Sequence, residues 1–336
     1  MKTFNNIIYS LLFFCVAINA SAAQQPNLIE KRINKSFDNI NANSLLNISN
    51  RYGDINIETS KDINKVTIEI ILEAWHSSKS KAENTLSSLS ISDNSSGNNI
   101  SFKTNTPSNS SINDRKGFKI TYNIKAPTSI NINLINKFGG IFSDDIDGKA
   151  FIEVSYGNLT IKELRNEDNE IIIKYGNGDI DFIEKASLDT KYLGKLNIGQ
   201  ANELEVTDSY GNINLGTAGI ISGSSKYSNL NISILKGQLD YKIGYGNINI
   251  EEVSKSFSGI NASSSYGSIK LNFNTNTEFS YEAYVRYGSF KSNLSTIENY
   301  YQVEQNTSSE FKGFNLKRNS ENKVYLKASY GSLKIN

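Results

Sequence analysis

Apolar and polar residues alternate in short stretches through most of this chain, and each stretch ends at an aromatic residue followed by glycine. In residues 152–161, apolar side chains occupy every second position up to Tyr156, and the same spacing resumes after Gly157. A period of two is typical of a strand buried on one face, and glycine allows a sharp bend. The pattern therefore predicts a strand, a tight turn and a second strand, with Tyr156 pointing inward.

The same phrase returns at intervals of roughly 20 residues. From Phe138, aromatic residues follow at steps of 18, 19, 17, 18, 17, 18, 21 and 21 residues, and a last step of 43 residues reaches Tyr330. Weaker copies lie at Tyr192 and Tyr227. The structural repeat positions are Tyr156, Gly157, Tyr175, Gly176, Tyr210, Gly211, Tyr245, Gly246, Tyr266, Gly267, Tyr287, Gly288, Tyr330 and Gly331. A fixed period near 20 residues indicates a repeat architecture.

Two all-β folds are compatible with this repeat. In a parallel β-solenoid, each period is one coil, and equivalent positions stack into rows along the axis. In an antiparallel meander, Gly-Asn would be a two-residue hairpin turn. The other end of each period has no constant turn residues, which a solenoid tolerates at one corner. We therefore predict a parallel β-solenoid of about ten coils, with the meander as the alternative.

Positions within the predicted coil have different expected roles. We expect the tyrosines before glycine to stack in the core, and Gly211 and Gly246 to lie at stacked turns with positive φ. Four asparagines occupy one outward slot of neighbouring repeats and would form an amide ladder on a regular polar face. These candidate binding residues are Asn197, Asn214, Asn231 and Asn249.

The region before the repeats has a different pattern. Residues 23–127 contain a long alternating strand at 66–74, a helical spacing at 80–89 and two further strands near 100–103 and 117–125. We interpret this region as a β-rich cap with one short helix, which covers the first coil. Residues 128–336 then form the repeat array.

The first 22 residues resemble a cleavable signal peptide. A basic start is followed by an apolar stretch, and Ala20-Ser21-Ala22 fits the small-residue cleavage rule. The alternative is a lipoprotein signal acylated at Cys15. No later stretch is long and apolar enough for a transmembrane segment. We expect an exported protein located in the periplasm, on the cell surface or in the medium.

Composition and charge narrow the class of partner. Lys and Arg number 35 against 34 Asp and Glu, so the sequence has no overall basic excess typical of nucleic-acid binding. The one cysteine leaves with the signal peptide, and therefore no disulfide stabilises the mature chain. The composition predicts no nucleic-acid partner.

Candidate chemistry is sparse. His76 is the one histidine, next to Trp75, and no nucleophile motif accompanies it. Carboxylates cluster at Asp144, Asp145 and Asp147, with further acids at Glu167, Asp168, Asp179 and Asp181. We interpret them as solvated turns, with weak Ca²⁺ binding or a β-helix carbohydrate-active site as alternatives. We expect no catalytic residues, no metal and no cofactor.

Three motifs together resemble a known group. Residues 52–57 read Tyr-Gly-Asp-Ile-Asn-Ile, residues 122–127 read Tyr-Asn-Ile-Lys-Ala-Pro, and serial Gly-Asn-Ile phrases follow. This arrangement resembles the "putative adhesin" families of unknown function from Bacteroidetes-type bacteria, similar to auto-transporter adhesin heads. The resemblance covers almost the whole mature chain, although Tyr here precedes glycine where those families usually have a small residue. It implies a β-solenoid and no catalytic residues.

We therefore predict an exported, non-enzymatic structural or adhesive module, whose partner is a glycan or a cell-surface protein. The alternative is a parallel β-helix polysaccharide lyase or hydrolase. The chain ends directly after its last repeat, so an open edge is expected near Leu333. Either the insert between Tyr287 and Tyr330 folds back as a lid on a monomer, or the edge pairs in a weak homodimer.

Overall fold

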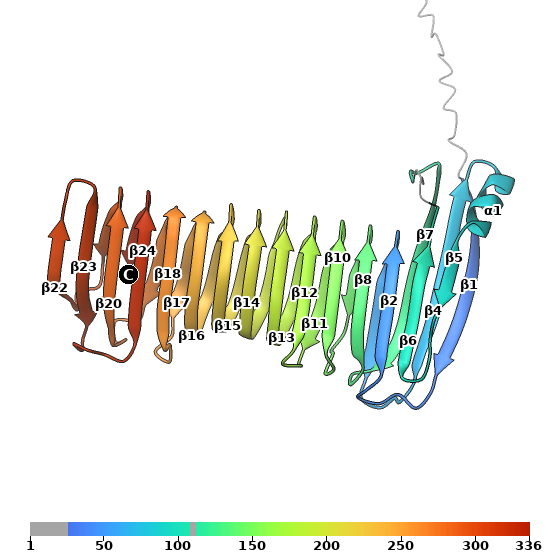
Figure 1. Ribbon diagram of the computed structural model, residues 1–336, viewed down its shortest axis with the longest axis horizontal. Helices are drawn as coiled ribbons and strands as arrows, with labels where there is room; N and C mark the ends of the chain where they lie inside the picture. Colours follow the sequence, from blue (N-terminus) through green and yellow to red (C-terminus); the bar gives the residue numbers. More distant parts are fainter. Residues whose placement is uncertain (1–25, 108–111) are drawn as a thin grey trace, which may run out of the picture.

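The computed structural model describes residues 26–107 and 112–336, which form an elongated all-β molecule with one helix (Figure 1). Its first part comprises the helix α1 (Lys79–Ser87) and the strands β1 (Asn27–Phe37), β2 (Leu45–Arg51), β3 (Ile55–Ser60), β4 (Val66–His76), β5 (Ser90–Asp93), β6 (Asn99–Asn105), β7 (Lys116–Pro127) and β8 (Asn131–Lys137). Helix α1 forms where the spacing at 80–89 predicted one.

The remaining strands follow one another along the long axis. They are β9 (Ile141–Ser143), β10 (Ala150–Ser155), β11 (Asn158–Leu164), β12 (Asn169–Lys174), β13 (Asn177–Lys191), β14 (Leu196–Ser209), β15 (Asn212–Lys226), β16 (Asn229–Tyr245), β17 (Ile248–Val253), β18 (Gly259–Tyr266), β19 (Ile269–Phe273), β20 (Phe279–Arg286), β21 (Ser289–Ser292), β22 (Ile297–Glu304), β23 (Ser308–Asn315), β24 (Lys323–Ser329) and β25 (Ser332–Ile335). All 25 strands of the described residues belong to one hydrogen-bonded sheet, which is not closed.

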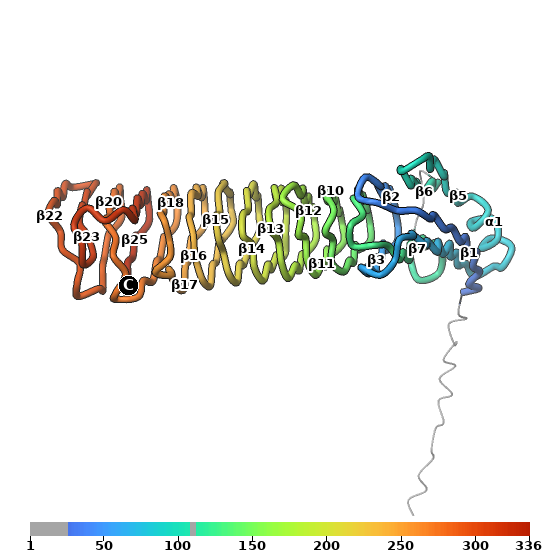
Figure 2. Tube along the Cα trace, turned by 90° about the horizontal axis from the view of Figure 1, so that it is seen from below, coloured from blue at the N-terminus to red at the C-terminus, as the bar shows by residue number. Residues whose placement is uncertain are grey.

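Strands one period apart pair in parallel through the middle of the molecule. In β10, Ile152 lies beside Leu134 of β8 on one side and beside Ile171 of β12 on the other. After the turn, Leu159 of β11 lies between Ile141 of β9 and Gly178 of β13. The chain thus advances by one strand spacing per period, as Figure 2 shows. Because these pairs are parallel, the antiparallel meander is wrong.

The alternating apolar positions form the core, as the period of two predicted. Ile152, Val154, Leu159 and Ile161 are buried, and the equivalent positions of the neighbouring strands join them in one continuous cluster. Most apolar side chains therefore stack on apolar side chains of the next strand, which removes the core from water along the molecule.

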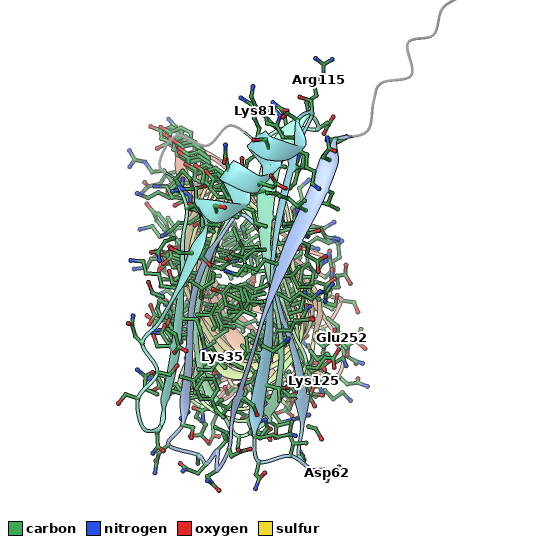
Figure 3. The ribbon with its side chains drawn as sticks, turned by 90° about the vertical axis from the view of Figure 1, so that its right-hand side faces the viewer. Lys35, Asp62, Lys81, Arg115, Lys125 and Glu252 are labelled. Atoms are coloured by element: carbon green, nitrogen blue, oxygen red, sulfur yellow. The ribbon has the colours of Figure 1, made fainter. Side chains whose placement is uncertain are left out.

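Antiparallel strands cover the N-terminal end. Strands β2 and β3 pair with β8 and β9 of the array, while β6 and β7 lie on their other side. Beyond them, β4 pairs antiparallel with β7, β1 with β4, and β5 with β6. Figure 3 looks onto this end, with Lys35 of β1 and Lys81 of α1 in view. Lys35 forms an ion pair with Asp93 of β5, which links the two outermost strands across the end of the core.

The C-terminal strands do not form the open edge that the sequence predicted. Strand β24 lies between β18 and β20 (Figure 1) and pairs in parallel with both. Strand β25 lies likewise between β19 and β21. Leu333 is only 1 % exposed. Between β21 and β24, the strands β22 and β23 form an antiparallel pair, which continues the sheet from β20. The last phrase of the sequence is therefore not the last layer of the sheet.

Two predictions lie outside what this fold tests. The signal peptide predicted for residues 1–22 lies outside the described residues. The division into a cap at residues 23–127 and an array at 128–336 stays a prediction. Within the described part of the chain, we find no helix with the length and apolar character needed to cross a membrane.

Candidate functional site

A single row of stacked aromatic rings runs along one edge of the molecule, and we call it the tyrosine row. In spatial order it contains Tyr52, Phe138, Tyr156, Tyr175, Tyr192, Tyr210, Tyr227, Tyr245, Tyr266, Tyr330 and Tyr287. Neighbouring ring centroids are 4.6–5.0 Å apart, and the ring planes are tilted by only 2–23°. At a strand spacing of about 4.8 Å, the row is roughly 50 Å long.

The tyrosines of this row lie at the surface, which corrects the prediction that they point inward. Tyr156, Tyr175, Tyr210, Tyr245 and Tyr266 are 43–47 % exposed. The prediction extended the alternation of the strand through the tyrosine. Tyr156 instead has φ of 56°, and the turn begins at that residue. Because alternation holds only for extended backbone, it no longer determines the direction of this side chain.

Most rings of the row sit on left-handed backbone. Nine of the eleven have φ between 54° and 64°, and at Tyr245 and Tyr266 the following glycines have positive φ instead. Left-handed backbone costs a residue with a side chain about 1–2 kcal/mol. Stacking on two neighbours recovers about 0.5–1.5 kcal/mol per aromatic pair. The cost of the left-handed backbone and the gain from stacking are of similar size. The row therefore keeps its aromatic rings at the surface with little net gain in stability.

Glycine is needed after most of the rings because the backbone of the neighbouring layer lies very close to it. In most turns the φ of this glycine would not by itself require glycine. A Cβ on Gly157 would lie 1.9 Å from the carbonyl oxygen of Gly139, and one on Gly176 would lie 1.8 Å from that of Gly157. Gly246 has φ of 135°, as predicted, whereas at Gly211 the preceding Tyr210 takes the positive φ. The prediction of a positive φ was therefore right for Gly246 and wrong for Gly211.

Two rows of asparagine amides accompany the rings. Of the predicted candidates, Asn214 donates to Asn197 Oδ1 at 3.3 Å, Asn231 donates to Asn214 Oδ1 at 3.1 Å, and Asn249 lies in register beside Asn231. A role for these four residues in binding stays a proposal.

The second amide row lies two residues after the rings, in most turns directly after the glycine, and sequence reasoning missed it. Asn177 donates to Asn158 Oδ1 at 3.2 Å, and in the later turns Asn229 donates to Asn212 Oδ1 at 2.8 Å and Asn247 to Asn229 Oδ1 at 3.2 Å. The constant Gly-Asn pair was the available signal, but we interpreted it only as turn chemistry. This second row borders the tyrosine row.

The acid cluster is engaged with cations of the chain itself. Arg165 lies 2.9 Å from Asp145 and 3.1 Å from Asp147, and Lys162 lies 2.5 Å from Asp144. Burial by itself raises the pKa of the Asp147 carboxyl. Hydrogen bonds from Thr128 and Arg165 outweigh burial and hold this pKa below its usual value. In the described part of the chain, no group of three or more His, Cys, Asp or Glu side chains has a metal-binding arrangement. The cluster resembles a structural ion network.

This network predicts an acid-sensitive contribution to stability. Because the folded-state pKa of Asp147 is lowered, its stabilisation is present above the unfolded pKa and is lost as pH falls through the folded value. Asp147→Asn should cost about 1 kcal/mol at pH 7, and should lose less stability than the parent between pH 5 and pH 2. Denaturant titrations of the parent and the variant at pH 7, pH 5 and pH 2 test this. Asp179→Asn, an exposed acid, is the charge-matched control, and an equal effect there would contradict the prediction.

His76 is positioned by its neighbours in sequence. Its Nδ1 accepts a hydrogen bond from the backbone N–H of Ser78 at 3.1 Å and lies 3.2 Å from the Ser77 hydroxyl. The adjacent Trp75 donates its indole N–H to the Asn113 carbonyl at 2.8 Å. These local contacts stabilise the end of β4.

The tyrosine row also predicts a difference between ring and hydroxyl. Tyr210 stacks on Tyr192 and Tyr227, each at 4.9 Å, and is 44 % exposed. Tyr210→Ala should cost about 1–3 kcal/mol, because two stacks are lost. Tyr210→Phe should cost less than about 0.5 kcal/mol, because the ring remains. Denaturant titration measures both, and equal losses would show that the stack contributes nothing.

The chain is similar to several solved structures. One is a "putative cell adhesion protein" from Clostridium sporogenes ATCC 15579, with 12% identity, 91% of this chain and 99% of that chain covered, and a TM-score of 0.21. Another is a "putative adhesin" from Bacteroides fragilis NCTC 9343, with 16% identity, 91% and 97% covered, and a TM-score of 0.32. A third is a "putative adhesin" from Parabacteroides distasonis ATCC 8503, with 11% identity, 92% and 97% covered, and a TM-score of 0.25.

The descriptions of these proteins confirm the resemblance to adhesin families noted in the sequence. No protein-family model matches the chain, and no curated protein matches it.

Proposed function

We propose that this chain is an exported, non-enzymatic adhesive module. In this proposal it is a parallel β-solenoid of about ten coils, with residues 23–127 as an N-terminal cap. Its side-chain rows would contact a glycan or a cell-surface protein. The regular parallel pairing between strands one period apart supports the solenoid, and the exposed tyrosine row supports the adhesive role.

The tyrosine row is the observation that carries this function. Nine of its tyrosines are 42–52 % exposed. Exposed aromatic rings add no buried apolar surface to the core. Contiguous exposed aromatic surface is typical of interaction sites, and strained backbone persists where function needs it. The asparagine rows add regularly spaced donors and acceptors along the same axis.

Binding to a glycan array and to a panel of cell-surface proteins tests the proposal. We expect retention on at least one ligand class, and loss of that retention in the double variant Tyr210→Ala with Tyr227→Ala. The double variant Asn214→Ser with Asn231→Ser tests the predicted amide candidates separately. Thermal denaturation should verify that each variant is folded. Binding that both double variants leave unchanged would contradict the proposed surface.

The absence of enzymatic activity is part of the proposal and has its own test. It is supported by the ion pairs of Arg165 and Lys162 with the acid cluster, which occupy the carboxylates that a glycosidase would need free. Release of sugar products from any polysaccharide, abolished by Asp144→Asn with Asp145→Asn, would favour a carbohydrate-active enzyme instead.

We also propose that the protein is a monomer. The outer strand β22 has a register shift between Asn299 and Tyr301, and it carries Glu298 and Glu304. Irregularities and charges on an edge strand oppose pairing with a second molecule. Light scattering at low micromolar concentration should therefore give the monomer mass. A mass that rises with concentration would favour the weak homodimer.

A further inference from the structure

Another row of side chains runs beside the tyrosine row, and it is formed by the residue before each ring. Over its first seven positions it contains, in register from strand to strand, Arg51, Lys137, Ser155, Lys174, Lys191, Ser209 and Lys226. We call it the basic row, because five of these seven positions are cations and the other two are serine. At the far end of the molecule, Arg286 holds the equivalent position before Tyr287.

Cations in this row are direct neighbours. Arg51 pairs in register with Lys137, and Lys174 with Lys191. Adjacent strands are about 4.8 Å apart, and like charges at opposite positions destabilise a sheet. An arrangement that repeats an unfavourable contact is expected where an external anion removes the repulsion.

Few carboxylates within the described residues neutralise the basic row. Among its five cations, only Lys174 forms an ion pair there, with Glu153 at 3.0 Å. Others lie beside the rings, with Arg51 at 4.8 Å from the centre of Tyr52 and Lys191 at 5.7 Å from that of Tyr192. Contact with an aromatic ring leaves a cation its full charge.

The turns as a whole carry a concentrated positive charge. Counting from the residue before each ring to the residue that begins the next strand, the cations are Arg51, Lys137, Lys174, Lys191, Lys195, Lys226 and Arg286, and Asp54 is the one acid. Asp54 is itself ion-paired with Lys119 at 2.8 Å. The whole chain has a formal net charge of only +1. Positive charge is therefore segregated onto this edge.

We propose that this edge binds an acidic polysaccharide that lies along the long axis of the molecule. The inference rests on the proposed adhesive function and specifies its ligand. Carboxylate or sulfate groups would pair with the basic row through charge-assisted hydrogen bonds. Sugar hydroxyls would meet the exposed tyrosine hydroxyls and the amides of the turn asparagines.

The stacking of the rings favours a polysaccharide over single-stranded nucleic acid. Proteins bind single strands by stacking bases on open aromatic faces. In the tyrosine row each inner ring is covered on both faces, for example Tyr175 by Tyr156 at 4.6 Å and by Tyr192 at 4.9 Å. Ring edges and hydroxyls are the parts left to solvent, and these suit a hydroxyl-rich polymer.

Biolayer interferometry on the purified chain tests the inference, with polygalacturonate, dextran sulfate, uncharged dextran and a single-stranded oligonucleotide as probes. We expect binding to at least one acidic polysaccharide that weakens as salt is raised, and none to dextran. The triple variant Lys174→Gln, Lys191→Gln, Lys226→Gln should weaken this binding at least about tenfold. The matched control is Lys185→Gln, Lys236→Gln, Lys255→Gln, which removes the same charge outside the basic row and outside the turns that carry the rings, and it should bind within about twofold of the parent.

Four results would overturn the inference. Equal loss in the two triple variants would show an effect of net charge alone. An oligonucleotide that binds as tightly as the polysaccharides would assign the edge to nucleic acid or to unselective polyanion binding. Retention of a neutral glycan or a protein in the array, with no acidic polysaccharide bound, would refute the ligand class but leave the adhesive function standing. Failure to bind anything would refute both.

Discussion

Gly246→Ala should lower the free energy of unfolding by at least about 3 kcal/mol. Gly246 has φ of 135°, and a Cβ there would lie 1.7 Å from the backbone carbonyl oxygen of Ser228. The φ alone costs about 1–3 kcal/mol for a residue with a side chain. The clash adds to this cost, because the oxygen belongs to the backbone of the turn between β15 and β16, where the Ser228 N–H is hydrogen-bonded to the Tyr245 carbonyl, and it cannot move alone. A denaturant titration of both proteins measures the difference.

Gly259→Ala is the matched control for this prediction. The nearest atom to a Cβ on Gly259 is the Lys323 carbonyl oxygen at 3.7 Å, an ordinary contact. This variant should therefore change stability by less than about 1 kcal/mol. If the two alanine variants lose the same stability, the close stacking of turns described above is wrong.

Removal of residues 317–336 should unfold the C-terminal end of the molecule while the rest remains folded. The deletion removes β24 and β25, whose buried apolar residues are Val324, Leu326, Ala328, Leu333 and Ile335. Their burial contributes on the order of 10 kcal/mol. Strands β20 and β21 would then lose their parallel partners. Because each layer contacts only its neighbours, we expect residues 274–316 to become sensitive to protease and residues 26–273 to stay resistant.

Trp75 reports separately on the other end. It is the one tryptophan of the chain and lies in β4. Its fluorescence transition in denaturant should stay unchanged after the deletion. Leu326→Asp, at a side chain 3 % exposed, should reproduce the effect of the deletion, whereas Tyr325→Asp, 46 % exposed on the next residue, should not. If the deletion shifts the Trp75 transition as far as it shifts the unfolding transition of the whole protein, the molecule unfolds as one unit.

Local patterns predicted those features of the fold that depend on neighbouring residues. The period of two identified Ile152, Val154 and Leu159 as core residues, and they are buried. The helical spacing located α1 within two residues at each end. The Gly-Asn phrase located the turns. In each case, the physical cause acts within a few residues of the chain, so it leaves a readable pattern.

Other features depend on residues far apart in the sequence. Tyr156 points outward because the turn takes a left-handed residue at the ring, a choice that depends on stacking against Phe138 and Tyr175 of the adjacent layers. Arg51 and Lys137 form part of one basic row only because β2 pairs with β8, across 85 intervening positions of the chain. Neither arrangement leaves a local signal.

The order of the last layers shows the same division. The repeat pattern identified the phrase at Tyr330 as one more strand, turn and strand, and those elements form there as β24 and β25. Their place between β18 and β20 follows instead from pairing with strands far away in the sequence, on the edge of β20 opposite to the one that pairs antiparallel with β23. Periodicity specifies what each segment becomes, because burial on one face is a local requirement. Hydrogen-bond pairing between distant strand edges determines where the segment lies. All strands with the same pattern can form such pairs, so the pattern does not tell which of them pair.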